Sequence, residues 1–190
     1  MNVFDKTIPY AEVWMVRPRE LPVTEFTMPE GFSIVSFKEG DQVQWAEIET
    51  TVGEFERIEE ALNYFNRTFA PYPHKLEKRM LFIQTDSGEK IGTATAWWKE
   101  TDDHTRFPLV HWVAIKPNYQ GKGLSKALTS RVLSLLQEFE NHTTIVLHTQ
   151  TWSHKAIRLY EKFGFKISDK NLDGKPNPDY EKVMDILHHL

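Results

Sequence analysis

A glycine-containing segment between two apolar stretches is the part of the sequence with the clearest chemistry. A β-rich run over residues 110–115 leads through Pro117 into Gln120-Gly121-Lys122-Gly123-Leu124-Ser125, and apolar residues at helical spacing follow as far as Phe139. The pattern predicts a strand, a loop and a helix. Glycines let the backbone approach a ligand closely, and the N–H groups at a helix N-terminus favour negative charge. The segment therefore predicts a binding site for a phosphate or pyrophosphate.

Two common nucleotide-binding motifs do not fit this loop. The P-loop pattern Gly-x-x-x-x-Gly-Lys-Ser/Thr is absent. The dinucleotide fingerprint requires a third glycine where Lys126 stands and an acidic residue after the next strand. The acids that are present, Glu138 and Glu140, fall in the predicted helix instead. Another kind of phosphate-bearing ligand is therefore expected.

Composition excludes several classes of function. The chain has 190 residues, of which 40% are hydrophobic and 26% charged, which suits one globular domain over residues 1–190. A net charge of −4 argues against a nucleic-acid partner. The absence of cysteine excludes thiolate metal ligands and a cysteine nucleophile, and no spacing resembles a zinc site, so no metal is expected. No apolar run has the length of a membrane span and no signal peptide is recognisable, so we expect a cytoplasmic protein without a membrane partner.

The rest of the chain alternates between strand and helix patterns. Strands are predicted over residues 12–17, 31–37, 80–84, 91–98, 109–115 and 144–149, and helices after Asp41 and over residues 54–69, 124–139 and 153–163. Pro71 and Pro73 are expected to end the second of these helices. The order strand–helix–strand–helix from residue 109 to 163 implies one parallel pair of strands in an otherwise antiparallel sheet.

A second segment carries a further pattern, and together the two patterns resemble a known family. This segment reads Ser153-His154-Lys155-Ala156-Ile157-Arg158-Leu159-Tyr160-Glu161-Lys162-Phe163-Gly164-Phe165. The two segments resemble the Gln/Arg-x-x-Gly-x-Gly/Ala loop and the Asn-x-x-Ala-x-x-Leu-Tyr-x-Lys-x-Gly-Phe helix of GNAT superfamily N-acetyltransferases. Ser125 and Ser153 depart from the usual residues. The resemblance is close over residues 80–167 and loose elsewhere.

The resemblance implies a fold and a division of labour within the chain. The implied fold is mixed α+β, with a mostly antiparallel central sheet, one splayed parallel strand pair and helices on both faces. Residues 80–167 would form the acetyl-CoA-binding core, and residues 1–75 the acceptor side. The family normally closes with a strand, which predicts a strand over residues 180–187. Dimers are common in the family, so a homodimer that exchanges the strand over residues 12–17 is possible.

The resemblance also implies a co-substrate and the residues that bind it. Acetyl-CoA would lie where the strands over residues 109–115 and 144–149 diverge. Residues whose backbone amides would hold the pyrophosphate are Gln120, Gly121, Lys122, Gly123, Leu124 and Ser125. Main-chain groups of Val113 and Ile115 would pair with the pantetheine arm, which Ser153 and Ala156 would also contact.

The implied reaction is direct attack on the thioester by a primary amine of a small molecule or peptide. Tyr160 would protonate the leaving thiolate; the alternative is a core aromatic residue on an amphipathic helix. Attack requires a neutral amine, so a base must take its proton near neutral pH. His111 is the candidate because histidine titrates in this range. The alternative for His111 is a partly buried ring hydrogen-bonded to a neighbour.

Two other functions remain open at this point. Gly123-Leu124-Ser125-Lys126-Ala127 approaches the Gly-x-Ser-x-Gly pattern of serine hydrolases, with Ser125 as nucleophile. That pattern requires a sharp turn directly from strand to helix, whereas residues 116–122 intervene here. A non-catalytic acyl-CoA-binding or sensor protein would keep the loop without turnover. The sequence names neither the acceptor amine nor the preferred acyl chain.

Overall fold

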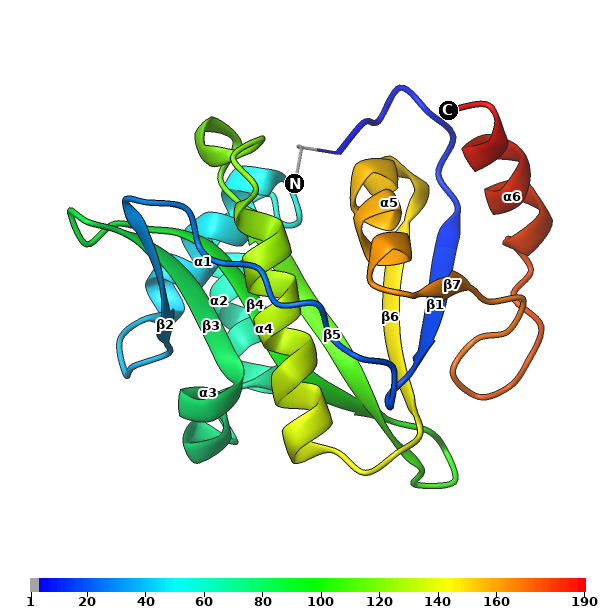
Figure 1. Cartoon of the computed structure of the whole chain (residues 1–190), viewed down its shortest axis with the longest axis horizontal. Helices are drawn as coiled ribbons and strands as arrows, with labels where there is room; N and C mark the ends of the chain where they lie inside the picture. The colour runs from blue at the N-terminus through cyan, green and yellow to red at the C-terminus, as the bar shows by residue number, and fades with distance from the viewer. Residues whose placement is uncertain (1–3) are drawn as a thin grey trace.

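The computed structural model describes residues 4–190, which form one seven-stranded sheet between two layers of helices (Figure 1). The strands are β1 (Glu12–Pro18), β2 (Phe32–Ser36), β3 (Met80–Thr85), β4 (Lys90–Glu100), β5 (Arg106–Ile115), β6 (Thr144–Gln150) and β7 (Lys166–Ile167). The helices are α1 (Gln42–Val52), α2 (Ile58–Thr68), α3 (Pro73–Arg79), α4 (Leu124–Phe139), α5 (His154–Lys162) and α6 (Tyr180–His188). No helix in the described part of the chain is long and apolar enough to cross a membrane.

The sheet has the strand order β2-β3-β4-β5-β6-β1-β7. Its neighbouring strands are antiparallel except for β5 and β6, which are parallel. This arrangement confirms the predicted mixed fold with one parallel pair. The pair is splayed, because only Leu109 and Val146 are in register between β5 and β6.

An irregularity in β5 accompanies this opening. The register between β4 and β5 shifts between Thr93 and Thr95, and Trp112 on β5 adopts a left-handed φ of 49°. Such a bulge inserts an extra residue and bends the strand that carries it. β5 therefore turns away from β6 at the level of Trp112, and the sheet opens between the two strands.

Each face of the sheet has its own hydrophobic core, and the helices divide between the two faces (Figure 1). Helices α1, α2 and α3 cover an aromatic core that contains Trp45, Phe65, Phe69, Phe82 and Trp97. Helices α4, α5 and α6 cover the other face, where aliphatic side chains predominate. The gap between β5 and β6 lets elements from both faces line one cavity.

The predicted closing strand over residues 180–187 is wrong, because this segment is helix α6. Val183 and Leu187 lie four residues apart, so both fall on one helical face, where they are buried against the core beside β1. A strand from near the N-terminus, β1, instead continues the sheet beside β6. β1 pairs with β6 along its whole length, from Glu12 opposite Gln150 to Pro18 opposite Thr144, and pairs with β7 on its other side.

The start of the second predicted helix also differs, and a helix that was not predicted follows it. The chain turns over residues 53–57, and α2 begins only at Ile58. α2 ends at Thr68, before Pro71 and Pro73 as predicted, and Pro73 then starts α3, a helix that was not predicted. Proline fits the first turn of a helix because its fixed φ suits the helix and its missing N–H would have no helical partner there.

Candidate active site

The glycine loop leaves β5, passes through a short 3₁₀ helix (Pro117–Tyr119) and enters α4 at Leu124. Gly121 and Gly123 adopt left-handed φ values of 78° and 81°, which other residues rarely adopt. A Cβ at either glycine would meet nothing within 4 Å, so the space beside the loop is open. The glycines are therefore needed for backbone conformation, and they leave room for a ligand.

A cavity of about 370 Å³ lies beside this loop, between the N-terminus of α4 and α5. Its lining residues are Gly121, Gly123, Ser125, Lys126, Lys155, Ala156, Arg158, Leu159 and Lys162. Four of these side chains are cationic, and no acidic side chain is among them. Basic side chains and the N-terminus of α4 together make this cavity suitable for a phosphorylated ligand.

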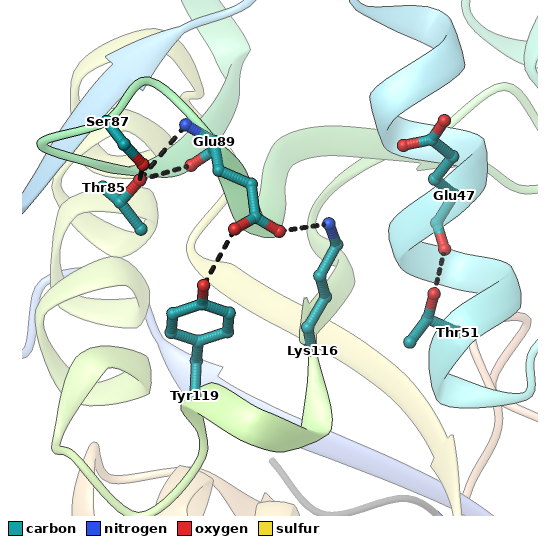
Figure 2. Close-up of polar contacts among 7 residues, drawn as sticks. All are labelled: Glu47, Thr51, Thr85, Ser87, Glu89, Lys116 and Tyr119. Atoms are coloured by element: carbon teal, nitrogen blue, oxygen red, sulfur yellow. Dashed lines mark hydrogen bonds and ion pairs between the residues drawn. The ribbon is translucent and has the colours of Figure 1, made fainter.

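A carboxylate on the neighbouring hairpin fixes the start of the loop. Glu89, in the turn between β3 and β4, accepts hydrogen bonds from Lys116 Nζ at 2.9 Å and from the Tyr119 hydroxyl at 2.8 Å (Figure 2). Gln120 then folds its side chain back and donates to the carbonyl oxygen of Ile115 at 2.8 Å. The Gln120 side chain thus holds the loop against β5, which leaves backbone groups for the ligand.

A second cavity, of about 270 Å³, occupies the opening between β5 and β6. Its lining residues are Glu49, Glu54, Val110, His111, Trp112, Val113, Leu147, His148, Thr149, Gln150 and Tyr160. Most of these residues lie on β5 and β6, while Glu49 and Glu54 come from α1 and the turn after it on one face of the sheet, and Tyr160 comes from α5 on the other. The cavity therefore passes through the sheet.

The two cavities divide the residues predicted from the sequence. The first contains Gly121, Gly123, Ser125 and Ala156, and the second contains His111, Val113 and Tyr160. The predicted residues that line neither of them are Ile115, Gln120, Lys122, Leu124 and Ser153. Leu124 is buried in the core, and the Ser153 hydroxyl oxygen accepts a hydrogen bond from Gln150 Nε2 at 3.4 Å.

Tyr160 is buried, and its ring packs edge-on against Phe165 at 6.0 Å between centroids. Burial raises the pKa of its phenol above the usual range, and the nearby Glu49 and Glu54 carboxyls add to the increase. The phenol is therefore protonated at neutral pH. A protonated side chain in this position can donate a proton to a leaving group that enters the cavity.

His111 lies within hydrogen-bond distance of one neighbour, as its alternative interpretation predicted. Its Nε2 is 3.2 Å from the hydroxyl of Tyr64, which accepts a hydrogen bond from the indole N–H of Trp112. Burial lowers the pKa of His111 to about 3, and Lys99 and His148 contribute to the decrease. The role of base stays a prediction for His111. This pKa argues against the role, because a base acts best when its pKa lies near the working pH.

Replacing His111 by glutamine should reduce the loss of stability in acid. The unfolded state, with an ordinary histidine pKa of 6.5, binds more protons than the native state between pH 6.5 and 3. The free energy of unfolding therefore falls as the pH falls through this window. At pH 5 the contribution of His111 is at most about 2 kcal/mol. Urea unfolding of both proteins at pH 5 and pH 7.5 measures it.

The control is the exposed His74, whose replacement by glutamine should leave the pH dependence as in the wild type. An unchanged difference between pH 5 and pH 7.5 in the His111→Gln variant would contradict the low pKa of the ring.

Two acidic residues in the second cavity were not predicted from the sequence. Glu49 on α1 is only 1% exposed, and its Oε1 has no hydrogen-bond partner. Glu54 follows α1, and burial of its carboxyl raises its pKa to about 7, against an opposing effect of Lys6. A signal for Glu49 was available, because it lies at helical spacing from Trp45 and Val52 on the apolar face of α1. Among the described residues, no group of three or more histidine and acidic side chains could hold a metal ion.

A family model described as the GNAT acetyltransferase family matches residues 37–165, which is more than half of the chain. The chain belongs to the GNAT acetyltransferase family. Mycothiol acetyltransferase of Pseudarthrobacter chlorophenolicus is 26% identical over 163 residues, which cover 83% of this chain and 50% of that protein. This GNAT chain thus spans about half the length of the curated mycothiol acetyltransferases that it matches.

Solved structures share the GNAT fold. A GCN5-related N-acetyltransferase from Sphaerobacter thermophilus superposes with a TM-score of 0.65 at 20% identity, covering 85% of this chain and 50% of that one. Arabidopsis thaliana Naa50, in complex with the bisubstrate analogue CoA-Ac-MVNAL, gives a TM-score of 0.57 at 20% identity, covering 77% of this chain and 91% of that one. At these identities the likeness establishes the fold.

Proposed function

We propose that the protein is an acetyl-CoA-dependent N-acetyltransferase that acetylates a primary amine of a small molecule or peptide by direct attack. The observation that carries this proposal is the position of α5 between the two cavities. Ala156 lines the cationic cavity and Tyr160 lines the cavity through the sheet. The two residues are four apart on one helical face, about 6 Å along the axis. The thioester of an acetyl-CoA whose pyrophosphate is held by the glycine loop could therefore reach Tyr160.

The residues of the first cavity fit the nucleotide part of acetyl-CoA. Backbone amides over residues 120–125 would hold the pyrophosphate at the N-terminus of α4, as in other helix-terminal phosphate sites. Lys126 and Lys155 would neutralise part of its charge. Val113 and Ile115 lie on β5 beyond its one registered contact with β6, and their main-chain groups would pair with the pantetheine arm.

Acetyl-CoA supplies the thioester whose carbonyl carbon the amine attacks. Tyr160 would then donate its proton to the sulfur as the C–S bond breaks. Because burial raises the pKa of its phenol, Tyr160 would carry this proton before the reaction. Calorimetry of acetyl-CoA and free CoA with the wild-type protein tests the binding step. If neither ligand binds to a folded protein, the proposal fails.

Ser125 has no place as a hydrolase nucleophile in this proposal. It is the second residue of α4, and a 3₁₀ helix and a loop separate it from β5. The sharp strand-to-helix turn of a nucleophile elbow is therefore missing. The Ser125→Ala variant should keep at least half of the wild-type rate of thiol release, because alanine is also small and the backbone amide is unchanged. Complete loss of activity in this variant would instead favour the hydrolase.

A non-catalytic acyl-CoA binder differs from the proposed enzyme in turnover alone. It would bind acetyl-CoA in calorimetry, yet release no thiol when a primary amine is added. Parallel assays of binding and thiol release on the same preparation therefore separate the two functions.

A further inference from the structure

We infer that Glu49 and Glu54 form the subsite for the ammonium group of the acceptor, and that Glu54 removes its proton. This inference rests on the proposed function and assigns two residues to its acceptor side. The acceptor class that follows is a cationic primary amine.

The end of α1 brings the two carboxyls to one cavity. Gly53 has a left-handed φ of 91° and its N–H bonds back to the last turn of the helix. The N–H of Glu54 donates to the carbonyl oxygen of Glu49 at 3.0 Å. This turn folds the chain back, so residues 49 and 54 line the same cavity as Tyr160.

The environment of the Glu49 side chain indicates a ligand that donates hydrogen bonds. Its side chain is almost completely buried, and its Oε1 has no partner among the described residues. An unpaired buried carboxyl is unfavourable, so such groups usually have a donor. The neighbouring acid, Glu54, makes no hydrogen bond to this oxygen, and burial together with the Glu54 carboxyl raises the pKa of Glu49 well above its usual range. An amine entering the cavity would bring N–H donors to Glu49.

Glu54 has the properties of a proton acceptor for this amine. Burial of its carboxyl raises its pKa to about 7, whereas the pKa of His111 is about 3. The other charged or titratable groups that act on Glu54 or line its cavity are Lys6, Tyr10, Glu49, His148 and Tyr160. Glu54 is exposed to solvent where it lines the cavity. A proton accepted by Glu54 can therefore pass to water.

Aromatic side chains surround the approach to these carboxyls. Trp112 lines the cavity, and its ring lies 5.3 Å from that of Phe55 and 5.0 Å from that of Tyr64. Aromatic faces attract ammonium groups and accommodate apolar carriers. The expected acceptor is thus a primary ammonium on an apolar or aromatic group.

The proton balance of the reaction is complete with these residues. The ammonium gives one proton to the Glu54 carboxylate, and its nitrogen then forms the C–N bond while the C–S bond breaks. Tyr160 gives its proton to the sulfur and regains one from the nitrogen, and Glu54 releases its proton to water. The products are the amide, the thiol and one proton.

Binding of 2-phenylethylamine, compared with its neutral analogue 2-phenylethanol, tests the subsite. Calorimetry at pH 7.5 with CoA-saturated protein should show the amine bound at least ten-fold more tightly by the wild type. The Glu54→Gln and Glu49→Gln variants should lose most of this preference. The matched control is Glu56→Gln, which removes an exposed acid two residues from Glu54 and should keep it. In the wild type, the preference should fall as the pH is lowered below about 7, and this dependence should be absent in Glu54→Gln.

Equal binding of the amine and the alcohol, or no binding of either, would overturn the inference. So would a Glu54→Gln variant that keeps the wild-type preference. A titration of CoA alone distinguishes failure of the acidic subsite from failure of the proposed function. Tight CoA binding without an amine preference refutes only the acidic subsite, whereas loss of CoA binding by the wild type refutes the proposed function.

Discussion

Replacement of Tyr160 by phenylalanine is expected to lower kcat by at least about 100-fold, within the range that a general acid contributes. The variant lacks only the hydroxyl, so the buried ring and its contact with Phe165 are retained. The dissociation constant for acetyl-CoA should change by less than two-fold. Steady-state thiol release and calorimetry on the same preparation measure both quantities.

Tyr72→Phe is the matched control for this substitution, because Tyr72 is 43% exposed and lies outside both cavities. It should retain the wild-type rate. A Tyr160→Phe variant with a kcat within three-fold of the wild type would remove Tyr160 from the proton transfer and leave it as a core aromatic residue.

Replacement of Gly123 by tryptophan is expected to weaken acetyl-CoA binding by more than 100-fold. A side chain at a left-handed φ of 81° costs about 1–2 kcal/mol. The indole would also fill the open space beside the loop, in a cavity of only about 370 Å³. Calorimetry of acetyl-CoA with the variant gives the affinity directly.

Gly174→Trp provides a control with the same kind of strain at another place. Gly174 has a φ of 73°, and a Cβ there would also meet nothing within 4 Å, but the residue lies in the loop before α6. This variant should bind acetyl-CoA like the wild type. If Gly123→Trp also kept the wild-type affinity, the glycine loop would be a helix start without a ligand.

The features that could be predicted from the sequence are those whose physical causes are local. Gly121 and Gly123 predict a left-handed backbone conformation, which glycine adopts more easily than other residues, and the structure shows it at both positions. The spacing of Ala156 and Tyr160 fixes a shared helical face, which lines the two cavities. The parallel pairing of β5 and β6 followed from a helix-length connection between two apolar strands.

Features that depend on distant parts of the chain could not be predicted. The short tail around Val183 has no decisive period, and its helical form depends on β1 already occupying the sheet beside β6. The low pKa of His111 arises mainly from its burial, and its hydrogen-bond neighbour Tyr64 lies on α2, 47 residues away in the sequence. Glu54 was predicted to begin a helix over residues 54–69, so its return to the cavity through the turn at Gly53 was missed.

The central claim is acetyl transfer to a primary amine, and the most direct measurement follows both products at once. Acetyl-CoA with a labelled acetyl group is incubated with the wild-type protein and a panel of primary amines, including apolar amines and peptides with a free N-terminus. We expect amine-dependent release of CoA thiol with equal transfer of label into an amide, and the Tyr160→Phe variant should be slower by at least about 100-fold. Thiol release that does not depend on any amine, with the label recovered as acetate, would contradict the account and indicate hydrolysis.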